Sequence, residues 1–194
     1  MITHIDGILE EKNPAFVVVD VNGIGYMLNI SLNTFSALPE KGRVRLFTHL
    51  SIREDAHVLF GFHNKEEREM FRHLISVSGV GPSTARIVLS GMNAQECASA
   101  IVNEDVGAFK GVKGIGAKTA ERIIVDLKNK VDADLIVGEK LFSSNNTIKI
   151  EALSALVVLG VDKKKAENII SKAIADNGDD LSVEDLVKLT LKSL

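Results

Sequence analysis

Two short segments of this chain repeat one pattern of glycines, and the repeat constrains the fold more than any other feature. They read Val-Ser-Gly-Val-Gly-Pro at 77–82 and Val-Lys-Gly-Ile-Gly-Ala at 112–117, with Gly79 and Gly114 separated by 35 residues. Each stands directly before a helical run, which predicts a tight hairpin that leads into a helix. Unpaired backbone N–H groups and the helix dipole then favour an anion at that point. Two such sites on one unit indicate a repeating anion, for which a nucleic-acid phosphate backbone is the obvious candidate.

One Gly-x-Gly alone is more often a simple turn, so the interpretation rests on the pair. Both copies place alanine four residues after the second glycine, at Ala85 and Ala120, where a small side chain lets helices approach closely. In this interpretation Gly81 and Gly116 let a phosphate come near, and side chains from the second copy add contacts. The predicted DNA-binding residues are Gly79, Val80, Gly81, Ser83, Lys113, Gly114, Ile115, Gly116, Lys118, Thr119 and Arg122.

Positive charge gathers around the second segment, although the whole chain has a formal net charge of −3. Between Phe109 and Lys130 six bases stand against only two acids, Glu121 and Asp126. The bases are Lys110, Lys113, Lys118, Arg122, Lys128 and Lys130. Such a patch is the electrostatic signature of a DNA-binding surface. Aromatic residues make up 5% of the chain with no Trp, which argues against a base-stacking platform.

The first 62 residues have the pattern of short strands. Asn22-Gly23 is a strong two-residue hairpin signal between two apolar runs, and Arg53-Glu54-Asp55-Ala56 joins a second pair. The expected strands include Ala15–Val21, Ile24–Ile30, Arg43–Ile52 and His57–Phe62. Five or six short strands in so few residues predict a small closed barrel, because closure removes exposed edges.

From Asn64 the period becomes helical. Pro82 suits the first turn of a helix, and Asn93 suits the cap of another. The expected helices are Lys65–Ser76, Ser83–Ser90, a run through Val102, Ala117–Val131, Ile148–Leu159, Lys163–Ala175 and Ser182–Leu191. The chain is therefore expected to be an α+β multidomain protein. The predicted parts are a barrel at 1–63, a helical domain at 64–131, a linker at 132–146 and a three-helix domain at 147–194.

Composition also suggests where the chain acts. The lone Cys97 rules out an intramolecular disulfide and suits a reducing cytoplasm. The first residues show no basic leader followed by an apolar core, and no apolar run is long enough to span a bilayer. We therefore expect a cytoplasmic protein without a membrane contact.

Two enzyme hypotheses compete with simple DNA binding. Residues 111–119 nearly match the nucleotide-binding pattern G-x-x-x-x-G-K-T, but Ala117 is inserted and residues 106–110 do not form a convincing strand. A DNA glycosylase would use a hairpin lysine and a downstream aspartate, for which Lys113 and Asp126 are candidates. The sequence shows no cluster typical of a metal site, and its five histidines are scattered. We expect no cofactor, no metal and no catalytic residue.

Taken together, these residues are similar to the RuvA family, whose members are the Holliday-junction-binding subunits of the bacterial RuvAB branch-migration machine. The resemblance runs from Met1 to Leu194. Its strongest segments are Asn22–Tyr26, Phe47–His49, Arg53–Ala56, Leu59–Phe62, Gly79–Pro82, Gly114–Gly116 and Lys118–Arg122. It implies an oligonucleotide-binding-type (OB-fold-like) barrel, a domain with two helix-hairpin-helix motifs and a mobile three-helix domain.

The resemblance further implies partners and roles. The chain would form a homotetramer, or an octamer of two tetramers, around a four-way junction. Glu54 and Asp55, which spacing alone suggests are an ordinary hairpin tip, would form an acidic pin that repels phosphates at the junction centre. The last domain would bind the RuvB motor, which itself binds ATP, through Leu156, Leu159 and Val161, and the nuclease RuvC is a further candidate partner. The alternative is a helix-hairpin-helix repair enzyme.

The sequence departs from the family pattern at both glycine motifs. Ser83 stands where relatives can carry a base, so the first hairpin is expected to rely more on backbone N–H groups. Lys113 stands where proline often precedes the second motif, which exchanges rigidity for charge.

Overall fold

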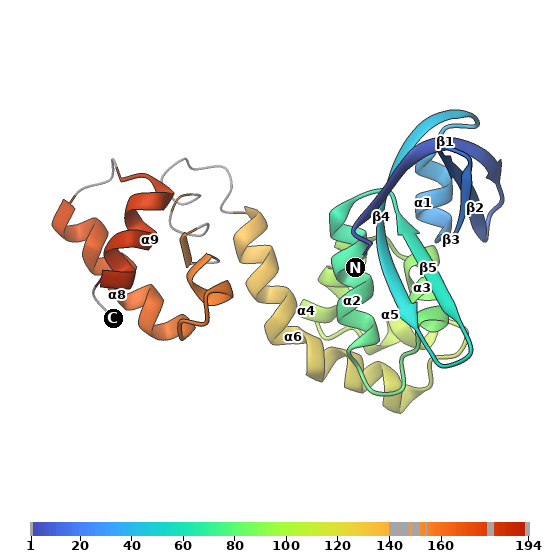
Figure 1. Ribbon diagram of the computed structural model, residues 1–194. Coiled ribbons are helices and arrows are strands. Elements are labelled where there is room, and N and C mark those ends of the chain that lie inside the picture. The colour runs from blue at the N-terminus through green and yellow to red at the C-terminus, as the bar shows by residue number, and fades with distance from the viewer. Residues whose placement is uncertain (1, 140–147, 149–151, 154, 178–180, 193–194) are drawn as a thin grey trace. The chain divides into compact units, whose positions relative to one another are not determined.

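The structure is a computed structural model that describes residues 2–139, 148, 152–153, 155–177 and 181–192 (Figure 1). The chain divides into two units, residues 1–132 and 133–194. The first holds the barrel and the helices that follow it, and the second has a small core of its own. Among the described residues, no helix is long and apolar enough to cross a membrane.

Five strands close into the predicted barrel. They are β1 (His4–Lys12), β2 (Phe16–Val21), β3 (Ile24–Asn29), β4 (Gly42–Ile52) and β5 (His57–Phe62), in the order β1-β2-β3-β5-β4. Asn22 and Gly23 make the predicted turn, with φ of 55° and 88°. The parallel pairing of β3 with β5, at Leu28 with Leu59, completes the ring. Buried apolar side chains such as Val17, Val19 and Leu46 fill it.

A short helix, α1 (Leu32–Ala37), interrupts the barrel strands and was not predicted. Its N-cap is Ser31, whose hydroxyl accepts a hydrogen bond from the backbone N–H of Thr34. Six residues are too few to show a helical period, which explains why the pattern missed it.

The predicted helices of the first unit form, with one difference in length. They are α2 (Lys65–Ile75), α3 (Pro82–Gly91), α4 (Ala94–Val102) and α6 (Ala117–Glu139), and a further short helix, α5 (Val106–Lys110), was not predicted. Asn93 caps α4 in a full capping box with Glu96. The sequence predicts that the last helix ends at Val131, but α6 continues to Glu139, so 132–139 of the expected linker is helical. Those residues lack a proline and reach their first glycine only at Gly138, while 140–146 lie outside the described residues.

The second unit contains α8 (Lys163–Asn177) and α9 (Val183–Lys192), preceded by helical residues at 152–153 and 155–158. Gly160 has a φ of 90°, consistent with the predicted break after the first of these helices. Ser182 caps α9, as predicted, and its hydroxyl donates to Asp185, which lowers the pKa of that carboxyl. Ala152, Leu156, Ala166, Ile170 and Leu186 form the buried cluster.

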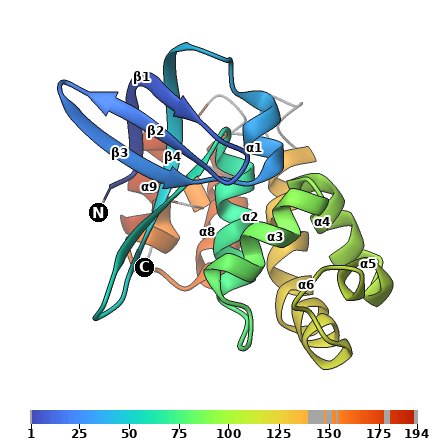
Figure 2. The ribbon, with the colours of Figure 1, turned by 90° about the vertical axis from the view of Figure 1, so that its right-hand side faces the viewer.

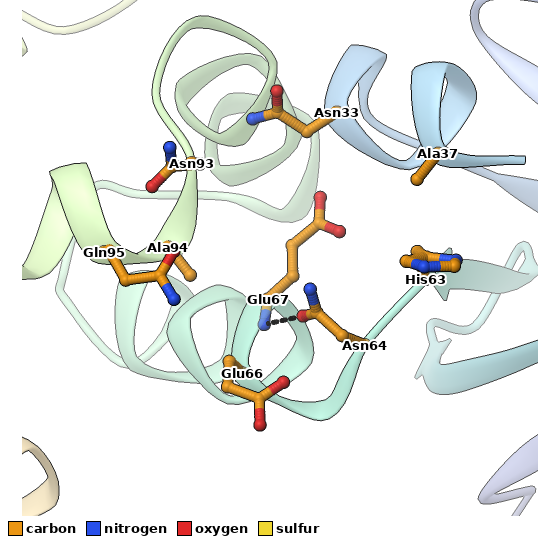
Figure 3. Close-up of a pocket in the computed structure, with 9 residues that line it drawn as sticks. All are labelled: Asn33, Ala37, His63, Asn64, Glu66, Glu67, Asn93, Ala94 and Gln95. Carbon is orange, nitrogen blue, oxygen red and sulfur yellow. Dashed lines mark hydrogen bonds between the residues drawn. The ribbon is translucent and has the colours of Figure 1, made fainter. Parts of the chain in front are cut away.

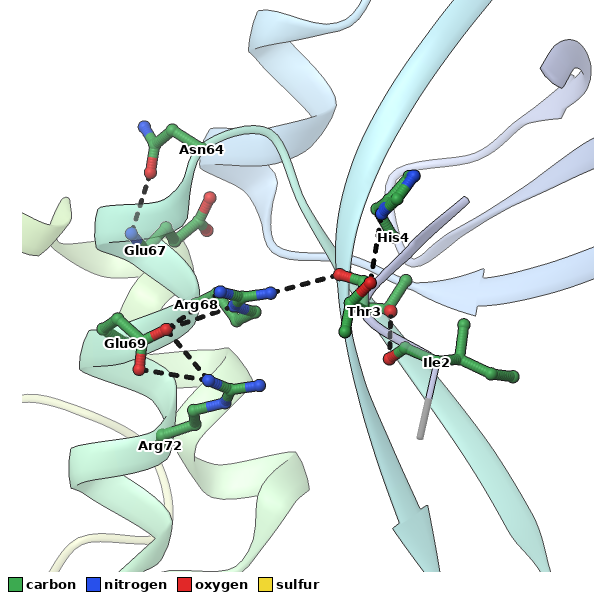
Figure 4. A network of polar contacts seen from close by, with 9 residues as sticks. Ile2, Thr3, His4, Asn64, Glu67, Arg68, Glu69 and Arg72 are labelled. Atoms are coloured by element: carbon green, nitrogen blue, oxygen red, sulfur yellow. Dashed lines mark hydrogen bonds and ion pairs between the residues drawn. The ribbon is translucent and has the colours of Figure 1, made fainter. Parts of the chain in front are cut away.

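Helix α2 fixes the barrel to the other helices through an aromatic contact. The Phe71 ring lies 4.9 Å from Phe62, 5.1 Å from Phe60 and 5.3 Å from His49, centroid to centroid. Burial lowers the pKa of His49. Arg68, one turn before Phe71, donates from Nη1 to the carbonyl of Thr3 at 3.1 Å, at the start of the barrel (Figure 4).

A buried carboxylate makes a second link between α2 and the barrel. Glu67 is 4% exposed and points from α2 toward α1 (Figure 3). It accepts hydrogen bonds from the hydroxyl of Ser31 and, at 2.7 Å, from that of Thr34. Thr34 in turn accepts from the backbone N–H of His63, at the end of β5. The carboxylate therefore joins α1, β5 and α2 at one point.

Candidate nucleic-acid interface

The two glycine segments form hairpins with the same backbone hydrogen bonds. Val80 N–H donates to the Val77 carbonyl at 3.0 Å, and Ile115 N–H donates to the Val112 carbonyl at 3.1 Å. Gly79 and Gly114 have φ of +92° and +94°, a conformation that side chains rarely adopt. The sequence repeat is therefore a structural repeat, and the glycine requirement at these two positions comes from the backbone.

The second glycine of each hairpin has a different role. A Cβ atom added at Gly81 or at Gly116 would meet nothing within 4 Å. Each residue precedes a helix whose first backbone N–H groups have no partner within the helix, and Gly81 caps α3 without a side-chain hydrogen bond. The space beside each glycine is therefore open, and a small residue there keeps side-chain bulk away from the start of the helix.

Each hairpin faces a threonine on the helix that follows the other hairpin. A Cβ at Gly79 would lie 4.0 Å from Oγ1 of Thr119 on α6, and one at Gly114 would lie 4.0 Å from Oγ1 of Thr84 on α3. Thr84 and Thr119 occupy equivalent places in the repeat, so the contacts are reciprocal. Both turns lie at the same end of the unit (Figure 2). The two turns form one surface, on which Gly81 and Gly116 each have open space beside them.

The predicted side chains on this surface divide into two groups. Val80 and Ile115 are buried, as are Ala85 and Ala120, so their side chains anchor the turns. Ser83, Lys113, Lys118 and Arg122 are exposed, and Thr119 is half-buried. Arg122 donates from Nη1 to the Ser78 carbonyl at 3.4 Å, which brings a cation of α6 to the first hairpin.

The acidic residues Glu54 and Asp55 form the tip of the β4–β5 hairpin. Backbone bonds between Arg53 and Ala56, at 2.9 and 3.3 Å, close this turn. Both carboxylate side chains are exposed, and no described residue forms an ion pair with them. The hairpin extends beyond the barrel toward the end of the unit that carries the glycine turns (Figure 1). Negative charge is thus held out from the barrel on an exposed turn.

The expected motor-binding residues do not all lie on the surface. Leu156 is fully buried in the C-terminal cluster, so the prediction that it contacts a partner is corrected: it is a core residue. Val161 packs partly against the same cluster, and Leu159 is 61% exposed. Two neighbours that were not predicted, Val157 and Val158, are also exposed. One face of this helical segment is buried and the other is exposed. The apolar residues occupy both faces, so their run in the sequence did not show which of them are buried.

The nucleotide-binding alternative loses support. Residues 106–110 form helix α5 and not the buried strand that a G-x-x-x-x-G-K-T loop requires. In the part of the chain that the structure describes, no three His, Cys, Asp or Glu residues are grouped as metal ligands. Cys97 is buried, which raises the pKa of its thiol to about 12.

Glu67 was not predicted as a structural residue, although the sequence carries a signal for it. Met70, Phe71 and Leu74 follow Glu67 by three, four and seven residues and are buried, so the acid belongs to the apolar face of α2. A lone acid on such a face predicts a buried carboxylate with hydrogen-bond donors around it.

Comparison with known proteins gives a consistent match along the chain. Residues 1–61 match the family described as RuvA N terminal domain, 71–129 the SAM-like Helix-hairpin-helix tandem, and 150–194 the RuvA, C-terminal domain. A protein from Christiangramia forsetii named Holliday junction branch migration complex subunit RuvA is 50% identical over 194 residues, all of both chains. Its namesakes from Flavobacterium psychrophilum and Cytophaga hutchinsonii are each 49% identical, over all of both chains and 99% of both chains respectively.

Proposed function

The chain belongs to the RuvA family, and from that premise we propose that it binds four-way DNA junctions and brings a RuvB-type ATPase motor to them for branch migration in recombination and repair. The observation that carries the proposal is the pair of equivalent glycine hairpins, each with open space beside its second glycine, Gly81 or Gly116. Each hairpin holds the phosphate backbone of a junction arm without reading its sequence.

Junction specificity then comes from the arrangement of several copies of this surface. Either hairpin alone binds any phosphate backbone, so it does not distinguish a junction from a duplex. A homotetramer, or two tetramers face to face, would place one pair of hairpins on each of four arms. The family match supports this arrangement, together with a role in the cytoplasm, where a bacterial chromosome lies.

The chain is proposed to contribute no catalytic step of its own. It holds DNA, the motor binds and hydrolyses ATP, and the chain itself needs no cofactor. A RuvC-type nuclease is a further proposed partner at the same junction. The exposed apolar residues Val157, Val158 and Leu159 of the second unit support a docking surface for the motor.

Binding to synthetic DNA tests the central proposal. We expect the protein to bind a four-way junction at least 100-fold more tightly than a linear duplex of equal length, with affinity that falls steeply as salt rises. Gel shifts at several salt concentrations measure both quantities. Equal affinity for the two DNAs would contradict junction binding, and cleavage or base release by the protein alone would favour the repair-enzyme alternative.

The acidic turn is proposed to lie at the centre of the junction, where its charge repels phosphates and guides the strands apart. We expect Glu54→Gln with Asp55→Asn to leave junction affinity unchanged or several-fold tighter, because repulsion of about 1 kcal/mol per close charge pair in water is removed. Branch migration with the motor should change in rate. A large loss of junction affinity would show that the carboxylates hold the DNA instead.

A further inference from the structure

The two hairpins have the same backbone geometry but differ in the charges of their side chains. In the 35-residue register, the exposed bases Lys113, Lys118 and Arg122 of the second hairpin correspond to Ser78, Ser83 and Ile87 in the first. At all three positions the second hairpin has a cation where the first has a neutral side chain. The backbone geometry is nevertheless the same in both copies, since the turn hydrogen bonds and the glycine φ angles agree.

The single base on α3 does not replace these charges. Arg86 is half-buried, and its Nη1 donates to the Ala15 carbonyl at 2.8 Å and to Oδ1 of Asn29 at 3.2 Å. Both partners belong to the barrel. The guanidinium of Arg86 therefore holds α3 against the barrel and is not directed at a ligand in front of the first hairpin.

Helix α6 brings cations to the first hairpin instead. Arg122 reaches the Ser78 carbonyl within the first glycine turn, at 3.4 Å. Lys130, two turns further along α6, places its Nζ 3.4 Å from Oγ of Ser76, just before the same turn. Thr119 also faces Gly79, so the start of α6 lies beside this hairpin. Both cations lie on the surface, where a bound phosphate can attract them.

We propose that the two hairpins hold DNA by different means: the second through its own cations, and the first through backbone N–H groups with charge supplied from α6 by Arg122 and Lys130. This inference rests on the proposed function, since it assigns the phosphates of a DNA arm to both hairpins. Under this proposal Arg122 serves both hairpins, because it attracts the phosphate at each of them.

The test compares equivalent positions of the two hairpins by the salt dependence of junction binding. Each phosphate that a cation neutralises adds about 0.9 to the slope of log affinity against log salt. Lys118→Ala should therefore lower the slope by about 0.9 for each engaged subunit, and Ser83→Ala should leave it unchanged. Ser83→Lys should raise the slope by a similar amount and tighten binding at low salt, because a backbone-held phosphate gains a cation.

Lys172→Ala, which removes an exposed charge from the second unit, is the matched control and should leave the slope unchanged. Thermal melts followed by circular dichroism show whether each variant is folded. An unchanged slope for Ser83→Lys or for Lys118→Ala would overturn the inference. If the wild-type protein shows no preference for the junction, the proposed function fails instead, and the slopes measured on duplex still decide the inference.

A double-mutant cycle tests the shared role of Arg122. We expect Arg122→Ala to weaken junction binding about tenfold in the wild-type background and only about threefold when Ser83→Lys is present, because the new lysine supplies the missing charge. Equal losses in the two backgrounds would show that Arg122 serves the second hairpin alone.

Discussion

Replacing Glu67 with alanine is expected to lower the free energy of unfolding of the first unit by about 3 kcal/mol. The substitution removes the acceptor for the buried hydroxyls of Ser31 and Thr34 and leaves a cavity between α1 and α2. Tyr26 is the only tyrosine and the chain has no Trp, so tyrosine fluorescence during urea denaturation reports on the barrel directly.

Glu67→Gln is the matched control. Glutamine keeps the volume, accepts from Thr34 through its carbonyl oxygen and can donate to the Ser31 hydroxyl, so we expect a loss of only about 1 kcal/mol. Equal losses for the two variants would show that the hydrogen bonds contribute little and that the negative charge itself matters. No loss in either variant would contradict the role of Glu67 as the link between the barrel and the helices.

Replacing Val158 with aspartate is expected to weaken docking of the motor by about 30-fold or more, as burial of a charge in the apolar centre of an interface does. Val158 is 84% exposed and stands between two other exposed apolar side chains, Val157 and Leu159. The substitution leaves the buried cluster of the second unit intact, so junction affinity should not change. Stimulation of branch migration by the motor, measured beside junction binding, separates the two effects.

Two further variants make this test specific. Leu191→Asp places the same charge on another exposed apolar residue of the second unit, and we expect stimulation to be retained. Leu156→Ala truncates a fully buried residue, so it should destabilise the second unit by about 3 kcal/mol. Normal stimulation by the Val158→Asp variant would place the motor-binding surface elsewhere.

Local patterns predicted the elements that local chemistry controls. Asn22-Gly23 adopts positive φ at both residues, and Asn93 bonds its own helix in a capping box. Such features depend on a few consecutive residues, so their sequence signature is complete. Where the local signal was weak, the predictions were wrong: the short helices α1 and α5 were missed, and α6 continues past its expected end.

Burial could not be predicted in the same way. Leu156 and Val158 belong to one apolar stretch, yet the first is fully buried and the second is exposed. Glu67 carries a charge and is buried all the same, because hydroxyl donors from a distant segment surround it. Each outcome depends on which element packs against the helix, and that information is spread over the whole chain.

The run of short strands in the sequence predicted the closed barrel. The sequence by itself determined the two glycine hairpins and the concentration of positive charge on the second one, since these depend on residues that are close together in the chain. Only the tertiary structure decided how the hairpins work together. Gly79 faces Thr119, Gly114 faces Thr84, and Arg122 donates a hydrogen bond to the Ser78 carbonyl. These residues are 30 to 44 positions apart in the chain. Contacts over that distance depend on how the helices pack, which no local pattern of residues specifies.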